Sequence, residues 1–209
     1  MTDWNSEELS LIELTTVGHY DANADSFWEG TKDHDVSQNR DAFLSACVQG
    51  KSLDIVDFGC GPGRDLKYFK EIGHVPVGLD GSKAFCEFAR RHTQCQVLQQ
   101  TFLNLKLPKA AFDGVFANAS LFHIPRQVLP RVLKELHESL RSGGVLFSSN
   151  PRGEGEVWQG QRYGHYMELE TSRPFLEAAG FEIEHHYYRP TGKPRHEQPW
   201  LAIVSRRVE

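Results

Sequence analysis

The chain has 209 residues, of which 39% are hydrophobic and 24% are charged, and its formal net charge is −5. This composition is typical of one globular α/β domain, and the acidic balance disfavours a partner such as nucleic acid, whose phosphates require a basic face. No apolar run approaches the ~20 residues of a membrane span, and the acidic N-terminus does not resemble a secretory signal. The four cysteines form no C-x-x-C pair, so we expect free thiols in a cytoplasmic protein without membrane contact.

Residues 1–50 are predicted to form a helical lid over the top of a sheet, within the same single domain as a core of residues 51–209. The stretch 19–39, HYDANADSFWEGTKDHDVSQN, is richer in reactive side chains than a lid requires. Asp33, His34 and Asp35 offer metal ligands, but adjacent side chains point in different directions, so we predict no metal site. We expect Asp35 to cap a helix, and His34 and Asn39 to face a pocket if a helix starts at Gln38.

From residue 53 onward, apolar runs alternate with helical patterns. Strands are predicted at 53–58, 75–80, 95–100, 112–119 and 145–150. Helices are predicted at 64–73, 82–92 and 168–181, with another that starts near Leu129 and ends at Gly143 and Gly144. The last two strands, 181–189 and 200–207, are joined by a Pro-rich loop without a helix and should pair antiparallel. The order predicts a mainly parallel sheet with helices on both faces and a C-terminal antiparallel hairpin.

A glycine-rich loop follows the first strand, in the stretch IVDFGCGPGRD (55–65). Its third glycine comes one residue too early for G-x-G-x-x-G, and the G-K-[ST] of a phosphate loop is absent. Asp57 and Asp80 end the first two strands, where ligands of such folds bind. An acid beside the loop suits a cationic ligand better than a pyrophosphate, and Asp80 can accept hydrogen bonds from two ribose hydroxyls. S-adenosylmethionine carries an ammonium, a sulfonium and a ribose, but no phosphate.

Four motifs occur in order between residues 56 and 151: VDFGCGPG, GLDGS, FDGVFANASLFHIP and LRSGGVLFSSNP. On these motifs the chain resembles the class I S-adenosylmethionine-dependent methyltransferases, which have a Rossmann-like seven-stranded sheet. Thr101 stands where many members have an acid that binds the adenine amine. We interpret Cys60 as a small packing residue within the loop. The resemblance implies that the cofactor contacts Tyr20, Trp28, Thr31, Asp57, Gly59, Cys60, Gly61, Gly63, Asp80, Gly81, Ser82, Thr101, Phe102, Asn118 and Ala119.

Stretches from about Tyr20 to Ser205 resemble a narrower group, the methyltransferase domain at the C-terminus of ovothiol synthases. They include FGCGPGRDLK, FANASLFHIPRQVLPRVL, LFSSNPRGEGE, RYGHYMELE and HHYYRPTGKPRHEQPWLA. The resemblance implies methylation of an imidazole ring nitrogen of 4-mercaptohistidine (5-thiohistidine), which gives ovothiol A. The sulfoxide-synthase half is missing from this sequence, so a separate sulfoxide synthase would supply this small-molecule substrate.

The expected acceptor is a small zwitterion with an aromatic ring and an acidic thiol. Arg152 or Arg189 would pair with its carboxylate. The other predicted acceptor contacts are aromatic or polar: Phe27, Asp33, His34, Asn39, Phe122, Asn150, Tyr163 and Tyr166. His34, His123 and Asn118 are the candidate catalytic residues, although methyl transfer to this acceptor does not require a general base. A packing role explains His123 equally well.

Two other classes of function remain open at this point. One is methylation of another small acceptor, such as histidine itself or a quinone-like phenol. The other is a non-catalytic subunit that binds S-adenosylmethionine, although the unbroken glycine loop and Asp80 weigh against loss of the cofactor. Methylation of nucleic acid is disfavoured, because NASL stands where many DNA methylators carry Asn-Pro-Pro-[Tyr/Phe].

Overall fold

The computed structural model describes residues 3–209, and its central feature is a seven-stranded sheet of order β3-β2-β1-β4-β5-β9-β8. The first five strands run parallel, and β9 is antiparallel to both of its neighbours. The predicted fold class is therefore confirmed. The strands are β1 (Asp54–Phe58), β2 (Val75–Asp80), β3 (Gln96–Gln99), β4 (Phe112–Asn118), β5 (Leu140–Pro151), β8 (Phe181–Arg189) and β9 (Trp200–Arg207).

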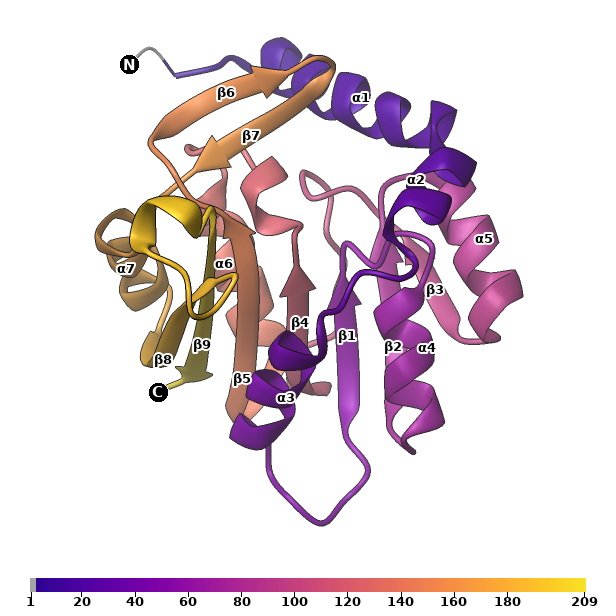
Figure 1. Cartoon of the computed structure of the whole chain (residues 1–209), viewed down its shortest axis with the longest axis vertical. Coiled ribbons are helices and arrows are strands. Elements are labelled where there is room, and N and C mark those ends of the chain that lie inside the picture. The colour runs from indigo at the N-terminus through magenta and orange to yellow at the C-terminus, as the bar shows by residue number, and fades with distance from the viewer. Residues whose placement is uncertain (1–2) are drawn as a thin grey trace.

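Helices cover both faces of the sheet (Figure 1). On one face, α3 and α4 insert Phe43 and Phe69, which are fully buried against Phe116 of β4. On the other face, α6 and α7 bury leucines such as Leu136 and Leu176. The layered core fixes where the carboxyl ends of the parallel strands come together. The bounds of the covering helices are α3 (Ser37–Ala46), α4 (Arg64–Glu71), α5 (Lys83–Thr93), α6 (Leu129–Ser139) and α7 (Leu169–Ala178).

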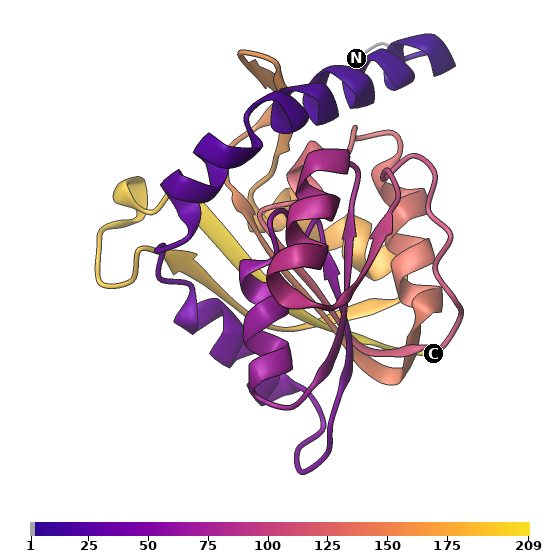
Figure 2. The same cartoon turned by 90° about the vertical axis from the view of Figure 1, so that its right-hand side faces the viewer.

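Two further helices, α1 (Ser6–Ala22) and α2 (Ala24–Thr31), lie across the carboxyl end of the parallel strands (Figures 1 and 2). A capping box starts α1, in which Asn5 accepts from the Glu8 backbone N–H and Glu8 accepts from that of Asn5. Only these two helices match the predicted lid. The third N-terminal helix, α3, instead packs on the face of the sheet because Phe43 belongs to the core.

The region after β4 departs from the prediction in two places. The helix expected to reach Gly143 ends at Ser139, because Leu140 is fully buried and already pairs with Phe112 in the sheet. Residues 155–166 form an unpredicted hairpin of β6 (Gly155–Gln159) and β7 (Arg162–Tyr166), separate from the main sheet. Figure 1 shows this hairpin beside α1, above the same end of the sheet. Within residues 3–209, no helix is long and apolar enough to cross a membrane.

Candidate functional site

A cavity of about 630 Å³ lies at the carboxyl end of the parallel strands, beneath α1 and α2. Its size is typical of small-ligand sites. Because β1, β2 and β4 are neighbours, side chains at or next to their carboxyl ends lie in a row along its floor: Asp80, Asp57 and Asn118. The loop after β3 closes one end of this row, and residues of β8 and β9 border the other.

Asp80 organises the glycine loop. Its Oδ2 accepts a hydrogen bond from the Gly61 N–H at 2.9 Å, and its Oδ1 accepts from the Ser82 N–H at 2.8 Å. Burial raises the pKa of Asp80 to about 6, although these N–H donors oppose the rise. Gly61, at φ +51°, lines the cavity, and so does Gly59, where a Cβ would lie 2.4 Å from the Ser120 Cβ. The loop therefore requires glycine at Gly59 and presents backbone to a ligand at Gly61.

Gly63 and Ser82 have structural roles and do not line the cavity. A Cβ on Gly63, the N-cap of α4, would lie 2.8 Å from a Thr93 methyl carbon, so this glycine permits α4 and α5 to pack closely. Ser82 caps α5 by accepting from the Phe85 N–H. The other thirteen predicted cofactor contacts all line the cavity: Tyr20, Trp28, Thr31, Asp57, Gly59, Cys60, Gly61, Asp80, Gly81, Thr101, Phe102, Asn118 and Ala119.

The Asp57 carboxylate is buried and lacks one partner. Only 3% of Asp57 is exposed, and its Oδ2 makes no hydrogen bond to any of the residues that the structure describes. Burial, and secondarily the nearby charge of Asp65, raises the pKa of Asp57 well above its ordinary value. An acceptor left unpaired inside a ligand cavity is costly unless a ligand donates to it. Asp57 lines the cavity, and the ammonium of S-adenosylmethionine fits its carboxylate in charge and in hydrogen-bonding capacity.

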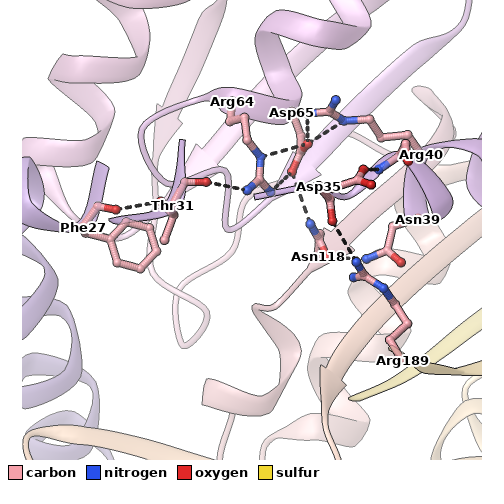
Figure 3. A network of polar contacts seen from close by, with 10 residues as sticks. Phe27, Thr31, Asp35, Asn39, Arg40, Arg64, Asp65, Asn118 and Arg189 are labelled. Carbon is pink, nitrogen blue, oxygen red and sulfur yellow. Dashed lines mark hydrogen bonds and ion pairs between the residues drawn. The ribbon is translucent and has the colours of Figure 1, made fainter. Parts of the chain in front are cut away.

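A buried ion-pair network supports the floor of the cavity (Figure 3). Asp65 of α4 lies between Arg40 and Arg64, at 2.6 Å and 2.8 Å respectively. Burial alone would raise the pKa of Asp65, but Arg64 and Arg40 outweigh it and hold the pKa below its usual value. Arg64 also donates to the Thr31 carbonyl at 3.0 Å, which ties the glycine-loop end of α4 to α2.

Asn118 is held in one orientation by the same network. Its Oδ1 accepts from Asn39 Nδ2 at 2.9 Å, and its Nδ2 donates to Asp65 at 3.3 Å. Asn39 in turn accepts from the Tyr187 hydroxyl at 2.8 Å. Because Asn39 is fully buried behind Asn118, it supports the cavity wall and does not contact the cavity, contrary to the expectation from sequence.

His123 lines the cavity with both ring nitrogens engaged. Its Nδ1 must donate to the Tyr163 carbonyl at 2.6 Å, because a carbonyl only accepts, so its Nε2 accepts from the Tyr20 hydroxyl at 2.8 Å. Burial lowers the pKa of His123 to about 4. The histidine is therefore neutral at pH 7 and holds the Tyr20 hydroxyl in the cavity wall. In this geometry it has no free nitrogen with which to act as a base.

The predicted acceptor contacts separate into two groups. Four line the cavity: Phe27, His34, Phe122 and Arg189. The others lie outside its lining: Asp33, Asn39, Asn150, Arg152, Tyr163 and Tyr166. Asn150 accepts from the Phe122 N–H at 3.2 Å, the Tyr163 hydroxyl is bonded to Glu156, and Tyr166 packs against the Phe122 ring.

Arg152 corrects the prediction most clearly. Its Nε lies 3.0 Å from Glu168 Oε1, and its Nη1 donates to the Arg195 and Gln198 carbonyls. These bonds use the guanidinium to attach the loop before β9 to the end of β5. Arg152 therefore does not offer its charge to a ligand in the cavity.

Two further residues that were not predicted from the sequence, Arg162 and Trp200, also line the cavity. Arg162 begins β7 and forms no ion pair with any residue in the range 3–209, and Trp200 begins β9. Arg162 belongs to the unpredicted hairpin. The only sign of its turn in the sequence is Gly160, which lies between the two short strands. The described residues contain no group of three or more His, Cys, Asp or Glu side chains arranged to hold a metal ion.

Comparisons with known proteins support a methyltransferase fold. The family model described as a methyltransferase domain matches residues 55–144. An uncharacterized methyltransferase of Oceanobacillus iheyensis is 24% identical over 155 residues, which cover 73% of this chain and 70% of that protein. A trans-aconitate 2-methyltransferase of Azoarcus sp. is 35% identical over 123 residues, or 58% of this chain, but the chain spans only 46% of that relative.

A solved structure resembles the whole chain. It is the 1,6-didemethyltoxoflavin-N1-methyltransferase of Burkholderia thailandensis with bound 1,6-didemethyltoxoflavin and S-adenosylhomocysteine. The TM-score is 0.78 at 19% identity, and the match covers 100% of this chain and 93% of that one. At this identity the likeness shows the fold alone.

Proposed function

We propose that this S-adenosylmethionine-dependent methyltransferase methylates an imidazole ring nitrogen of 4-mercaptohistidine, the step that gives ovothiol A. The sequence resemblance to ovothiol synthases supports the choice of acceptor. The observation that carries the proposal is the pair of arginines, Arg162 and Arg189, in the same cavity as the orphaned Asp57. The acceptor has a carboxylate and an acidic thiol, and two guanidinium groups match these two anionic positions.

Within this proposal, the row of residues along the cavity floor orders the cofactor. Asp80 accepts from the ribose, Asp57 accepts from the ammonium, and Gly61 leaves room for the methionine backbone. S-adenosylmethionine supplies an electrophilic methyl group when it is bound. The methyl group then lies towards Asn118, at the end of β4, where the acceptor part of the cavity begins.

The acceptor part of the cavity combines positive charge with aromatic walls. Phe122 and Trp200 provide flat apolar surfaces for an imidazole ring, and Arg162 and Arg189 lie among them. Positioning supplies most of the acceleration in an in-line displacement, where well-oriented partners gain about 7–11 kcal/mol. No base is required, because a thiolate neighbour leaves a ring nitrogen nucleophilic near neutral pH. This agrees with a His123 that is neutral and fully bonded.

The Burkholderia structure supports nitrogen as the acceptor atom. That enzyme is an N1-methyltransferase with bound 1,6-didemethyltoxoflavin, and its fold matches 100% of the present chain. We extend from it only the class of reaction, N-methylation of a small heterocycle.

A separate sulfoxide synthase would supply the thiol-histidine, and the proposed location is the cytoplasm, in keeping with four free cysteines.

The purified protein is expected to methylate 4-mercaptohistidine and to leave histidine unmodified when each is incubated with S-adenosylmethionine. Mass spectrometry of the products provides the measurement, and binding of S-adenosylhomocysteine serves as the control for an intact cofactor site. Equal methylation of histidine would replace the proposed acceptor with histidine. Absence of product from both, with cofactor binding intact, would favour another acceptor or a non-catalytic subunit.

Substitution of Arg162 by alanine is expected to raise the KM for 4-mercaptohistidine about tenfold or more, because one charge-assisted hydrogen bond is lost. The affinity for S-adenosylhomocysteine should change little, since Arg162 is assigned here to the acceptor and Asp80 and Asp57 to the cofactor. Steady-state kinetics and calorimetry measure the two quantities. Arg91→Ala, at an exposed position on α5, is the matched control. An unchanged KM would remove Arg162 from the acceptor site.

A further inference from the structure

Glu13 is an acidic side chain that lines the cavity and has no role in the site described above. It projects from α1, and its Oε1 accepts a hydrogen bond from the Leu103 N–H at 3.0 Å. Burial raises the pKa of Glu13, while that N–H and the neighbouring Thr101 hydroxyl oppose the rise. An acid in such surroundings is a candidate for ligand binding when it also faces a cavity.

The strand order decides which part of the cofactor lies near Glu13. Along the edge of the sheet the order is β3, β2, β1 and β4, so Asp80 lies between the loop after β3 and Asp57. The ribose occupies the middle of S-adenosylmethionine, with adenine and methionine on opposite sides of it. If the ammonium meets Asp57 and the ribose meets Asp80, the adenine must extend towards Thr101, Phe102 and Leu103.

The walls at this end of the cavity suit a flat heterocycle. Phe102 is fixed by stacking on the buried Phe58 ring, at a centroid distance of 4.4 Å. A Cβ on Gly81 would lie 3.1 Å from a Val17 methyl carbon, so α1 and the loop after β2 approach closely here. Both Gly81 and Val17 line the cavity. The slot is therefore bounded by α1 on one side and by the loops after β2 and β3 on the other.

We propose that Glu13 recognises adenine by accepting a hydrogen bond from its exocyclic amino group. Oε1 is engaged by Leu103, whereas Oε2 has no hydrogen-bond partner among residues 3–209. The Thr101 hydroxyl lies beside the carboxylate, but it too makes no hydrogen bond to the described residues. A carboxylate oxygen only accepts, so it favours an amino group at the 6-position of the purine and disfavours a carbonyl there. Thr101 does not impose this choice, because a hydroxyl both donates and accepts.

The position of Glu13 depends on the attachment of α1 to the rest of the protein. Asp21, near its end, accepts from the Ser82 hydroxyl at 2.6 Å and from the Ala84 N–H at 2.9 Å, at the start of α5. Thr16 accepts from the Tyr163 N–H at 3.1 Å. These contacts place an acid from residue 13 beside Thr101, which lies 88 positions later in the sequence. The N-terminal helix thus contributes a residue that determines specificity for the cofactor.

The test compares two ligands, S-adenosylhomocysteine and its 6-oxo counterpart S-inosylhomocysteine, in wild-type protein and in Glu13→Gln. Calorimetry measures the four dissociation constants. The glutamine keeps an acceptor for Leu103 but presents an NH₂ group in place of Oε2. We expect Glu13→Gln to bind S-adenosylhomocysteine about tenfold to a hundredfold more weakly and to bind S-inosylhomocysteine at least as well as wild type does. Glu7→Gln, an exposed position on the same helix, should leave all four constants unchanged.

An unchanged ratio of the two dissociation constants in Glu13→Gln would overturn the proposal. So would a wild-type protein that binds both ligands equally. If a fall in Tm shows that Glu13→Gln does not fold, the two wild-type dissociation constants still test the proposal, because equal values would contradict it. The inference rests on the cofactor and not on the proposed acceptor, so a failure to methylate 4-mercaptohistidine does not affect it.

Discussion

Asp80→Asn is expected to weaken the binding of S-adenosylhomocysteine about a hundredfold or more. The carboxylate can accept from both ribose hydroxyls, and a hydrogen bond to a charged group contributes about 1.5–3 kcal/mol. Asparagine keeps the shape of the side chain but replaces one acceptor with a donor. Calorimetry measures the loss, and Asp25→Asn, at an exposed position on α2, is the matched control. Unchanged affinity in a folded Asp80→Asn variant would show that Asp80 does not bind the ribose.

The same carboxylate makes cofactor affinity depend on pH. Burial raises the pKa of Asp80 to about 6, and the ribose hydroxyls donate to the ionised form. Below this pH Asp80 must lose a proton before it binds the ribose. The affinity should therefore decrease as the pH is lowered, by up to about tenfold per pH unit. Asp57, whose pKa is also raised, adds a similar dependence that the Asp80→Asn variant retains. The difference between the wild-type and variant profiles therefore reports Asp80, and parallel profiles would contradict the assignment.

Asp65→Asn is expected to reduce the free energy of unfolding by about 3–5 kcal/mol, because it leaves two largely buried arginines without their counter-charge. Arg40 and Arg64 have side-chain exposures of only 16% and 23%, so solvent screens them weakly. Since the pKa of Asp65 lies below its ordinary value, this stabilisation is present at pH 7 and is lost as the pH falls below about 4.

Urea unfolding at pH 7 measures the effect of Asp65→Asn. The matched control is Asp41→Asn, at an exposed position on α3 next to Arg40 in the sequence. In the Asp65→Asn background, Arg40→Gln should cost less stability than it does in wild type, because the ion pair is already absent. If Asp65→Asn lowers the free energy of unfolding by less than about 1 kcal/mol, the network contributes no more than weak surface ion pairs do.

The N-terminal region shows why local patterns were insufficient. Residues 1–50 were predicted to form one lid, yet α3 packs on the sheet, whereas α1 lines the cavity. Phe43, which makes α3 part of the core, looks no different in the sequence from an aromatic residue that lines a pocket. The distinction depends on which residue it meets, here Phe69 and Phe116.

The arginines illustrate the same limit. Arg152 follows β5 directly and was a natural choice for the acceptor's carboxylate, but Glu168 and two backbone carbonyls bind it. Arg162, on a short hairpin outside the main sheet, lies in the cavity instead. Neighbours that compete for a guanidinium come from distant parts of the chain, so the sequence does not reveal which arginine remains available.

The sequence alone determined the sheet, the glycine loop and the positions of Asp57 and Asp80, because strand periodicity, glycine spacing and the residues at strand ends are local properties. Only the tertiary structure decided that Asp57 has an unpaired oxygen, that His123 is fully bonded, and that α1 brings Glu13 to the loop after β3. Each of these depends on hydrogen-bond partners far apart in the chain. The residues at the strand ends could therefore be predicted from sequence, whereas their hydrogen-bond partners required the fold.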